Sequence, residues 1–192
     1  ILDEGKKIAT KERQQIATTL GYSESVFIND VSLGSVSIFN PQSEVPFAGH
    51  AMIGTAWFIN KTGNQPIDSL VCDGGTIKTW VDDDKTWIRA GLTMMPPWNY
   101  KQMKNASEVE HLAPRITISK KHTFIWAWAD EVKGFIRART FASDWGIPED
   151  EANGSGSMKL AATLGRSIEI VHGKGSIIYA KPWRSDFADL GG

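Results

Sequence analysis

The stretch SVSIFNPQSEVPFAGHAMIGTAWF, residues 35–58, decides the fold that we expect for this 192-residue chain. Apolar and polar residues alternate over Ser35–Phe39, which predicts a half-buried strand. Two prolines then make Asn40–Phe47 a loop. A helix begins at Gly49 and is apolar nearly all round, so we expect it to be buried. Strand, loop and buried helix in this order favour an α+β lobe with a helix packed on a sheet.

Working outward, the apolar spacing predicts one helix over Lys11–Leu20 that ends at Gly21, and a second buried helix over Gly154–Leu164. A short helix is expected over Ser107–Leu112 and a polar loop over Ser143–Asn153. The other predicted strands are Ser25–Asn29, Leu70–Cys72, Thr76–Val81, Thr86–Ala90, Arg115–Ser119, Thr123–Ala129, Phe135–Phe141, Ser167–His172 and Ser176–Lys181.

The order of elements repeats along the chain. Gly49 and Gly154 open the two buried helices 105 residues apart, and each helix follows an acidic, proline-containing segment. The repeat predicts two α+β lobes, residues 1–95 and 96–192, each an antiparallel sheet around one central helix. Met95-Pro96-Pro97-Trp98 is the expected crossover between them.

Composition argues against several classes of function. Hydrophobic residues make up 41% of the chain and the formal net charge is −1, so a polybasic surface for nucleic acid is not expected. No apolar run is long enough for a membrane span, and no signal peptide is evident at Ile1. Cys72 is the single cysteine, which excludes an internal disulfide and a zinc site built from several thiolates. We expect a cytoplasmic protein.

The two helix starts are candidate anion sites. Phe47-Ala48-Gly49-His50 and Ala152-Asn153-Gly154-Ser155 each place a glycine beside a polar residue at a helix N-terminus. Free backbone N–H groups and the positive end of the helix dipole attract a carboxylate there. Plain helix capping is the alternative, and spacing alone does not decide between them.

Several ionisable residues are candidates for chemistry. His50 is suited to acid–base work or to capping its own helix, and Glu24 is either a solvated carboxylate or a proton shuttle in a cleft. The acidic triplet Glu149-Asp150-Glu151 is interpreted as complementing the dipole of the following helix. The remaining histidines show no metal-ligand spacing and are assigned to surface or core: His111, His122 and His172.

Three motifs together resemble one family. They are Gly21-Tyr22-Ser23-Glu24-Ser25-Val26-Phe27, the run from Ile38 to His50, and Gly146-Ile147-Pro148-Glu149-Asp150-Glu151-Ala152-Asn153-Gly154-Ser155. In this order they resemble the signatures of the PhzF-like phenazine-biosynthesis isomerases, which are relatives of diaminopimelate epimerase. The match runs from about Leu2 to Ala180.

The resemblance implies two pseudo-symmetric lobes with the active site between them. It assigns proton transfer to Glu24, places His50, Asp150 and Ser155 in the same catalytic site, and gives substrate binding to Gly49, Asn153 and Gly154. The chemistry implied is isomerisation or epimerisation of a small carboxylated metabolite, with neither cofactor nor metal. Family members also carry a first strand that lies before Ile1 here, so the first lobe is expected to lack it.

The resemblance further makes a homodimer plausible and leaves the exact substrate open. Two other readings remain: a catalytically inactive protein of the same fold that binds a small carboxylate, and a purely structural dimer module. Loss of proton exchange with retained binding in Glu24→Gln would distinguish the enzyme from the first of these.

Overall fold

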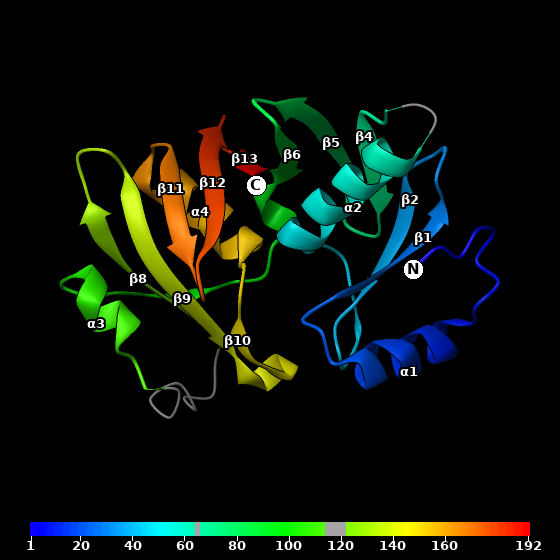
Figure 1. Ribbon diagram of the computed structural model, residues 1–192, viewed down its shortest axis with the longest axis horizontal. Coiled ribbons are helices and arrows are strands. Elements are labelled where there is room, and N and C mark those ends of the chain that lie inside the picture. The colour runs from blue at the N-terminus through cyan, green and yellow to red at the C-terminus, as the bar shows by residue number, and fades with distance from the viewer. Residues whose placement is uncertain (64–65, 114–121) are drawn as a thin grey trace. The chain divides into compact units, whose positions relative to one another are not determined.

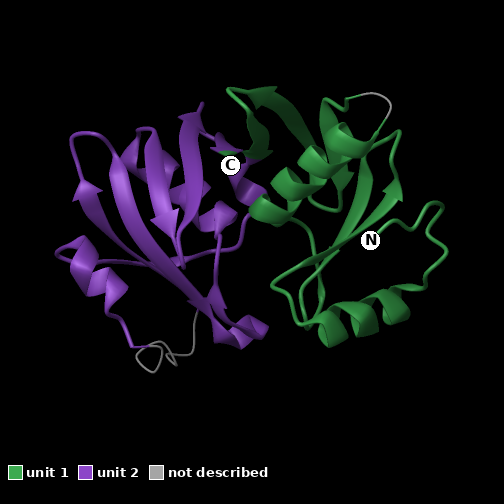
Figure 2. Cartoon of the chain, viewed as in Figure 1, with its two compact units in different colours: residues 1–90, 191–192 green, residues 91–190 purple. Residues whose placement is uncertain are grey.

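The computed structural model describes residues 1–63, 66–113 and 122–192, in two compact units (Figure 2). Unit 1 comprises residues 1–90 and 191–192, and unit 2 comprises residues 91–190. Each unit is described by itself. The strand expected over Arg115–Ser119 falls outside the described residues.

Unit 1 builds a sheet with the strand order β1-β2-β4-β5-β6 and two helices (Figure 1). Short β3 pairs with β2 off this path. Its elements are α1 (Thr10–Leu20), β1 (Ser25–Asp30), β2 (Ser35–Phe39), β3 (Glu44–Val45), α2 (Gly49–Thr62), β4 (Ser69–Cys72), β5 (Gly75–Asp82) and β6 (Lys85–Gly91).

Unit 2 has the strand order β13-β12-β11-β9-β8-β7, with β10 paired to β9. Its helical elements are η1 (Leu92–Met94), α3 (Ala106–Glu110), η3 (Ser143–Trp145) and α4 (Gly154–Leu164). Its strands are β7 (Asn99–Gln102), β8 (Thr123–Asp130), β9 (Phe135–Ala142), β10 (Ile147–Asp150), β11 (Ile168–His172), β12 (Ser176–Trp183) and β13 (Phe187–Gly191).

The two units repeat the same connection, as the sequence predicted. In unit 1 the chain runs β1-β2-β3-α2-β4, and in unit 2 it runs β8-β9-β10-α4-β11. The turn between the first two strands of this connection is also similar in the two units. Asp30 accepts a hydrogen bond from the Leu33 amide, and Asp130 accepts one from the Lys133 amide. Both turns end on glycines of positive φ, Gly34 at 60° and Gly134 at 77°.

The expectation of purely antiparallel sheets is wrong. Strand β4 pairs in parallel with β2, and β11 pairs in parallel with β9. The physical reason is the helix between the paired strands, because a crossover through α2 or α4 returns the chain to the sheet in its original direction. The fold is therefore α+β with mixed sheets.

Two further expectations need correction. Part of the loop expected over Ser143–Asn153 is strand β10, which pairs with β9 through Ile147 and Asp150. The α2 helix is buried on one face only, since Met52, Ala56 and Ile59 are buried whereas Trp57 is 55% exposed. An apolar sequence therefore did not mean burial on every side of that helix.

The N-terminal segment is fixed to unit 1. Leu2 pairs in parallel with Ile28 of β1, and the amide of Asp3 donates to the Ile28 carbonyl. The buried Asp3 carboxylate is paired with the Arg13 guanidinium of α1, which also lies 5.0 Å from the centre of the Phe27 ring. These contacts hold α1 against β1 and position the segment that leads into β1.

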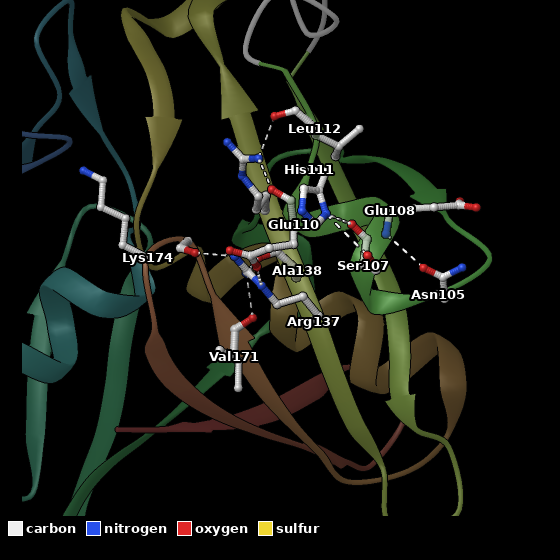
Figure 3. Close-up of polar contacts among 12 residues, drawn as sticks. Asn105, Ser107, Glu108, Glu110, His111, Leu112, Arg137, Ala138, Val171 and Lys174 are labelled. Carbon is white, nitrogen blue, oxygen red and sulfur yellow. Dashed lines mark hydrogen bonds and ion pairs between the residues drawn. The ribbon is translucent and has the colours of Figure 1, made fainter.

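The α3 helix covers one part of the unit 2 sheet. Val109 and Leu112 pack with Ile125, Ala127 and Phe141 in one apolar cluster. Figure 3 shows Arg137 of β9 between this helix and β11: its Nε donates to Glu110 at 2.6 Å, and its Nη1 donates to the Val171 carbonyl at 3.0 Å.

Candidate active site

Glu24 lies in a short connection between α1 and β1. Gly21 ends α1 with a left-handed φ of 66°, and the chain reaches β1 at Ser25. The Glu24 side chain is only 12% exposed, and its Oε2 lies 2.9 Å from Nε2 of His50. Ser23 places its hydroxyl oxygen 3.3 Å from the same histidine nitrogen. A carboxylate and an imidazole are thus in direct contact.

His50 is the second residue of α2. The residue before the helix, Ala48, has extended backbone and makes no side-chain cap, and the first turn contains no acidic residue. The His50 ring lies against the Glu24 carboxylate. Because the first amides of a helix have no acceptor inside it, this helix start keeps the anion-attracting character that the sequence indicated.

The start of α4 is built differently. Asn153 accepts a hydrogen bond from the Gly156 amide at 2.7 Å, so it is a true side-chain cap. Its amide nitrogen donates to Asp150 at 2.8 Å, and Asp150 also accepts from the Ala152 amide. Both side chains are buried. Asp150 therefore holds the residue that fixes the first turn of α4.

Ser155 lies in that first turn and is 8% exposed. Its Oγ accepts a hydrogen bond from the Trp98 indole nitrogen at 2.9 Å. The sequence analysis did not single out Trp98 as a site residue, and no local signal marks it, because 57 positions separate it from Ser155.

The predicted site residues therefore gather at two helix starts. Glu24, Gly49 and His50 belong to unit 1, and Asp150, Asn153, Gly154 and Ser155 belong to unit 2. Over residues 1–63, 66–113 and 122–192, no group of three His, Cys, Asp or Glu side chains has the geometry of a metal site. Among the helices in these ranges, none has both the length and the apolarity needed to cross a bilayer.

The sequence model of the family described as "Phenazine biosynthesis-like protein" (PhzC-PhzF) matches residues 1–113, more than half of the chain. The chain belongs to this family.

Curated relatives of this family member include isomerases. The chain is 22% identical to a trans-2,3-dihydro-3-hydroxyanthranilate isomerase of Pseudomonas chlororaphis, over 87% of this chain and 73% of that protein. It is 24% identical to "Antisense-enhancing sequence 1" of Schizosaccharomyces pombe, over 83% of this chain and 72% of that protein. Membership supports an enzyme of the isomerase or epimerase type.

Solved structures show the same fold. A PhzF-family protein of Enterococcus faecalis superimposes with a TM-score of 0.81 at 17% identity, covering 98% of this chain and 85% of the other. A predicted epimerase of Pseudomonas aeruginosa gives a TM-score of 0.69 at 16% identity, covering 100% and 88%. The fold expected from the resemblance is confirmed.

The acidic triplet of this phenazine biosynthesis-like protein precedes α4, whose own first turn contains no acidic residue. Within the triplet, Asp150 lies at the helix start, where it accepts from the Ala152 amide and from Asn153. Glu149 makes a two-bond ion pair with Arg139, with nitrogen–oxygen distances of 2.6 and 2.8 Å. The hydrogen bonds that Arg139 donates to Glu149 raise the pKa of Arg139. Glu151 pairs with Lys174. The triplet thus anchors β10 and the β11–β12 turn.

His172 is a fully buried core residue behind the α4 start. Its Nε2 lies 2.9 Å from the Thr140 hydroxyl, and its ring lies against Phe124. Burial lowers the pKa of His172, and the negative charge of Asp150 acts in the opposite direction. A neutral imidazole therefore packs beneath the residues that shape this helix start.

Proposed function

We propose that the protein is a cofactor-independent isomerase or epimerase of a small carboxylated metabolite, with Glu24 as the proton-transferring group. The observation that carries the proposal is the contact of 2.9 Å between Glu24 and His50 at the start of α2, a helix without a side-chain cap. A shielded carboxylate, an imidazole and a cluster of backbone donors are the parts that carbon–hydrogen proton transfer needs.

The chemistry follows from these parts. Removing a proton from carbon next to a carbonyl or carboxyl group leaves enolate-like charge on oxygen. Backbone N–H groups at the α2 start are fixed donors for that charge and do not reorganise during the reaction. Glu24 takes the proton from one carbon and returns it to another. His50 orients the Glu24 carboxylate through the contact at Oε2.

The start of α4 supplies the second half of the proposal. There the Ser155 hydroxyl and the first amides of the helix would bind the substrate carboxylate, while Asn153 and Asp150 hold the turn in place. The family resemblance assigned Asp150 to the catalytic residues and Asn153 to substrate binding. Their side chains are already bonded to each other, so we propose that they act by shaping the helix start.

The substrate class comes from the curated relatives. Two Pseudomonas proteins that match this chain are named trans-2,3-dihydro-3-hydroxyanthranilate isomerases. We therefore propose a small cyclic carboxylate with an acidic C–H bond as the first substrate to test. We also keep the homodimer as a proposal, which light scattering of the purified protein at several concentrations tests directly.

The deciding experiment is hydrogen–deuterium exchange at substrate carbon. The protein is incubated in D2O with a panel of small carboxylates that includes trans-2,3-dihydro-3-hydroxyanthranilate, and mass spectrometry follows deuterium incorporation. Incorporation by the wild type, with none by Glu24→Gln, supports the proposal. Binding of a panel member by calorimetry without any incorporation would reject it in favour of a catalytically inactive carboxylate-binding protein.

A further inference from the structure

We propose that Trp98 is a positioning residue that fixes the Ser155 hydroxyl as a hydrogen-bond donor. The start of α4 then selects an anionic carboxylate over a neutral carboxamide. The inference deepens the proposed function and rests on it, because it concerns the proposed carboxylate-binding end of the site.

The direction of one hydrogen bond carries the argument. The Trp98 indole Nε1 lies 2.9 Å from Ser155 Oγ. An indole N–H only donates, whereas a serine hydroxyl both donates and accepts. Ser155 must therefore accept from Trp98, and its own proton is left to point at another partner. A phenylalanine at position 98 would leave the hydroxyl free to turn.

The indole ring itself is held by an aromatic cluster, which we define as Trp98, His122 and Trp145. The centre of the Trp98 ring lies 5.2 Å from that of Trp145 and 5.3 Å from that of His122, both edge to face. The His122 ring stacks on Trp145 at 4.0 Å. The two nitrogens of His122 contact the Asp144 carboxylate and the Pro97 carbonyl.

The chain on either side of Trp98 is tied to α4 as well. Lys159 of α4 donates to the carbonyls of Met95 and Pro96 at 3.0 and 3.1 Å. The Tyr100 hydroxyl donates to the Gly156 carbonyl at 2.8 Å. Burial raises the pKa of Tyr100, so this phenol stays a neutral donor. Contacts on both sides keep the indole within reach of Ser155.

The result is a helix start that presents donors only. Asn153 accepts from the Gly156 amide, whereas the amides that precede Gly156 in the first turn have no acceptor within the helix. A carboxylate offers acceptors on both oxygens. A carboxamide must place an NH2 group against one of these donors, which leaves that donor unpaired.

The hydrogen bond is tested first, without any ligand. Protein labelled with 15N at tryptophan gives one indole N–H signal for each residue, and Trp98→Phe identifies the Trp98 signal. In Ser155→Ala that signal is expected to shift and to exchange faster with solvent. An unchanged signal would show that the bond is absent and would overturn the inference.

Selectivity is tested with anthranilate and anthranilamide, a matched carboxylate and carboxamide, by calorimetry. We expect the wild type to bind anthranilate more tightly, and Trp98→Phe to reduce the affinity ratio by about threefold to tenfold, the usual range for one hydrogen bond. Adding Trp98→Phe to Ser155→Ala should cause no further loss of the ratio, because Trp98 acts through Ser155. Trp57→Phe, which changes an exposed tryptophan of α2, is the matched control.

The following outcomes would overturn the inference. A wild-type ratio retained in Trp98→Phe, or losses that add in the double variant, would overturn the inference. If Trp98→Phe does not fold, Ser155→Ala decides in its place, and an unchanged ratio there overturns it. If Glu24 catalyses deuterium exchange but Trp98→Phe leaves the affinity ratio unchanged, this inference is rejected and the proposed function stands. A wild type that neither exchanges deuterium nor binds either probe rejects the proposed function and the inference together.

Discussion

The Oε2 atom of Glu24 lies 2.9 Å from the Nε2 atom of His50, which joins the connection before β1 to the first turn of α2. Glu24 immediately precedes its strand, and His50 is the second residue of its helix. A shielded carboxylate in contact with an imidazole is an arrangement suited to proton transfer.

Glu24→Gln is expected to abolish proton transfer while keeping the fold. Glutamine preserves shape and cannot carry a proton between carbons, so deuterium incorporation should fall by at least about a hundredfold. Mass spectrometry of substrate in D2O measures this, and calorimetry should show that substrate still binds. Equal incorporation in variant and wild type would exclude Glu24 as the base.

His50→Gln is expected to lower the exchange rate by about tenfold through loss of the group that orients Glu24. The matched control is His111→Gln, because His111 is exposed and its ring nitrogen contacts Ser107 of α3. The control should retain the wild-type rate. Equal rates in both variants and the wild type would remove His50 from the mechanism.

Gly156→Ala is expected to destabilise unit 2 and to disturb the start of α4. A Cβ at this position would lie 2.4 Å from Asn153 Oδ1 and 2.5 Å from Phe124 Cδ2, so the cap or the ring must move. We expect a loss of about 1–3 kcal/mol in the free energy of unfolding, measured by urea denaturation.

The control for that substitution is Gly54→Ala, within α2. A Cβ there meets nothing within 4 Å, and alanine favours helix, so a gain of about 0.5–1 kcal/mol is expected. If Gly156→Ala raises the free energy of unfolding as Gly54→Ala does, the close packing described at the α4 start would be contradicted.

Asp3 is expected to make the protein sensitive to acid. Burial opposes its charged form, but the hydrogen bonds from Arg13 and the Ile8 amide outweigh this and lower the pKa of Asp3 below its ordinary 3.8. The stability that it contributes is therefore present above pH 4 and is lost as the pH falls through the lowered pKa.

The measurement is urea unfolding between pH 5 and pH 2. Asp3→Asn should lose stability at pH 5 and show a flatter decline toward pH 2 than the wild type. Arg13→Gln should flatten the curve in the same way, because it removes the main favourable partner of the carboxylate. A variant curve parallel to that of the wild type would contradict this assignment.

Much of the fold was predictable because its signals are local. The glycine that ends α1, Gly21, adopts the left-handed conformation expected of it, and both central helices begin at the predicted residues, Gly49 and Gly154. Capping and periodicity depend on neighbours in sequence, so a sequence alone reveals them.

Features that depend on distant partners were not predictable. Strand β7 (Asn99–Gln102) has no apolar alternation to reveal it, yet it pairs in parallel with β8. The parallel partners of β2 and β9 depend on where a helix returns the chain. The contacts that Trp98 and Arg139 make with Ser155 and Glu149 depend on the folded backbone.

The candidate site was predictable in part. Motifs named Glu24 and His50, and the structure brings them together in unit 1. Motifs also named Asp150, Asn153 and Ser155, which lie together in unit 2. They did not reveal that Asn153 caps α4, that Asp150 holds Asn153, or that the Ser155 hydroxyl accepts from a tryptophan. Roles at catalysis stay predictions until the exchange experiment is done.

The repeated hairpin turn, with Asp30 and Gly34 in one copy and Asp130 and Gly134 in the other, has a consequence for engineering. Each copy closes its turn with its own hydrogen bonds, so a substitution in one turn leaves the hydrogen bonds of the other intact. The elements that follow each turn can therefore be altered one unit at a time.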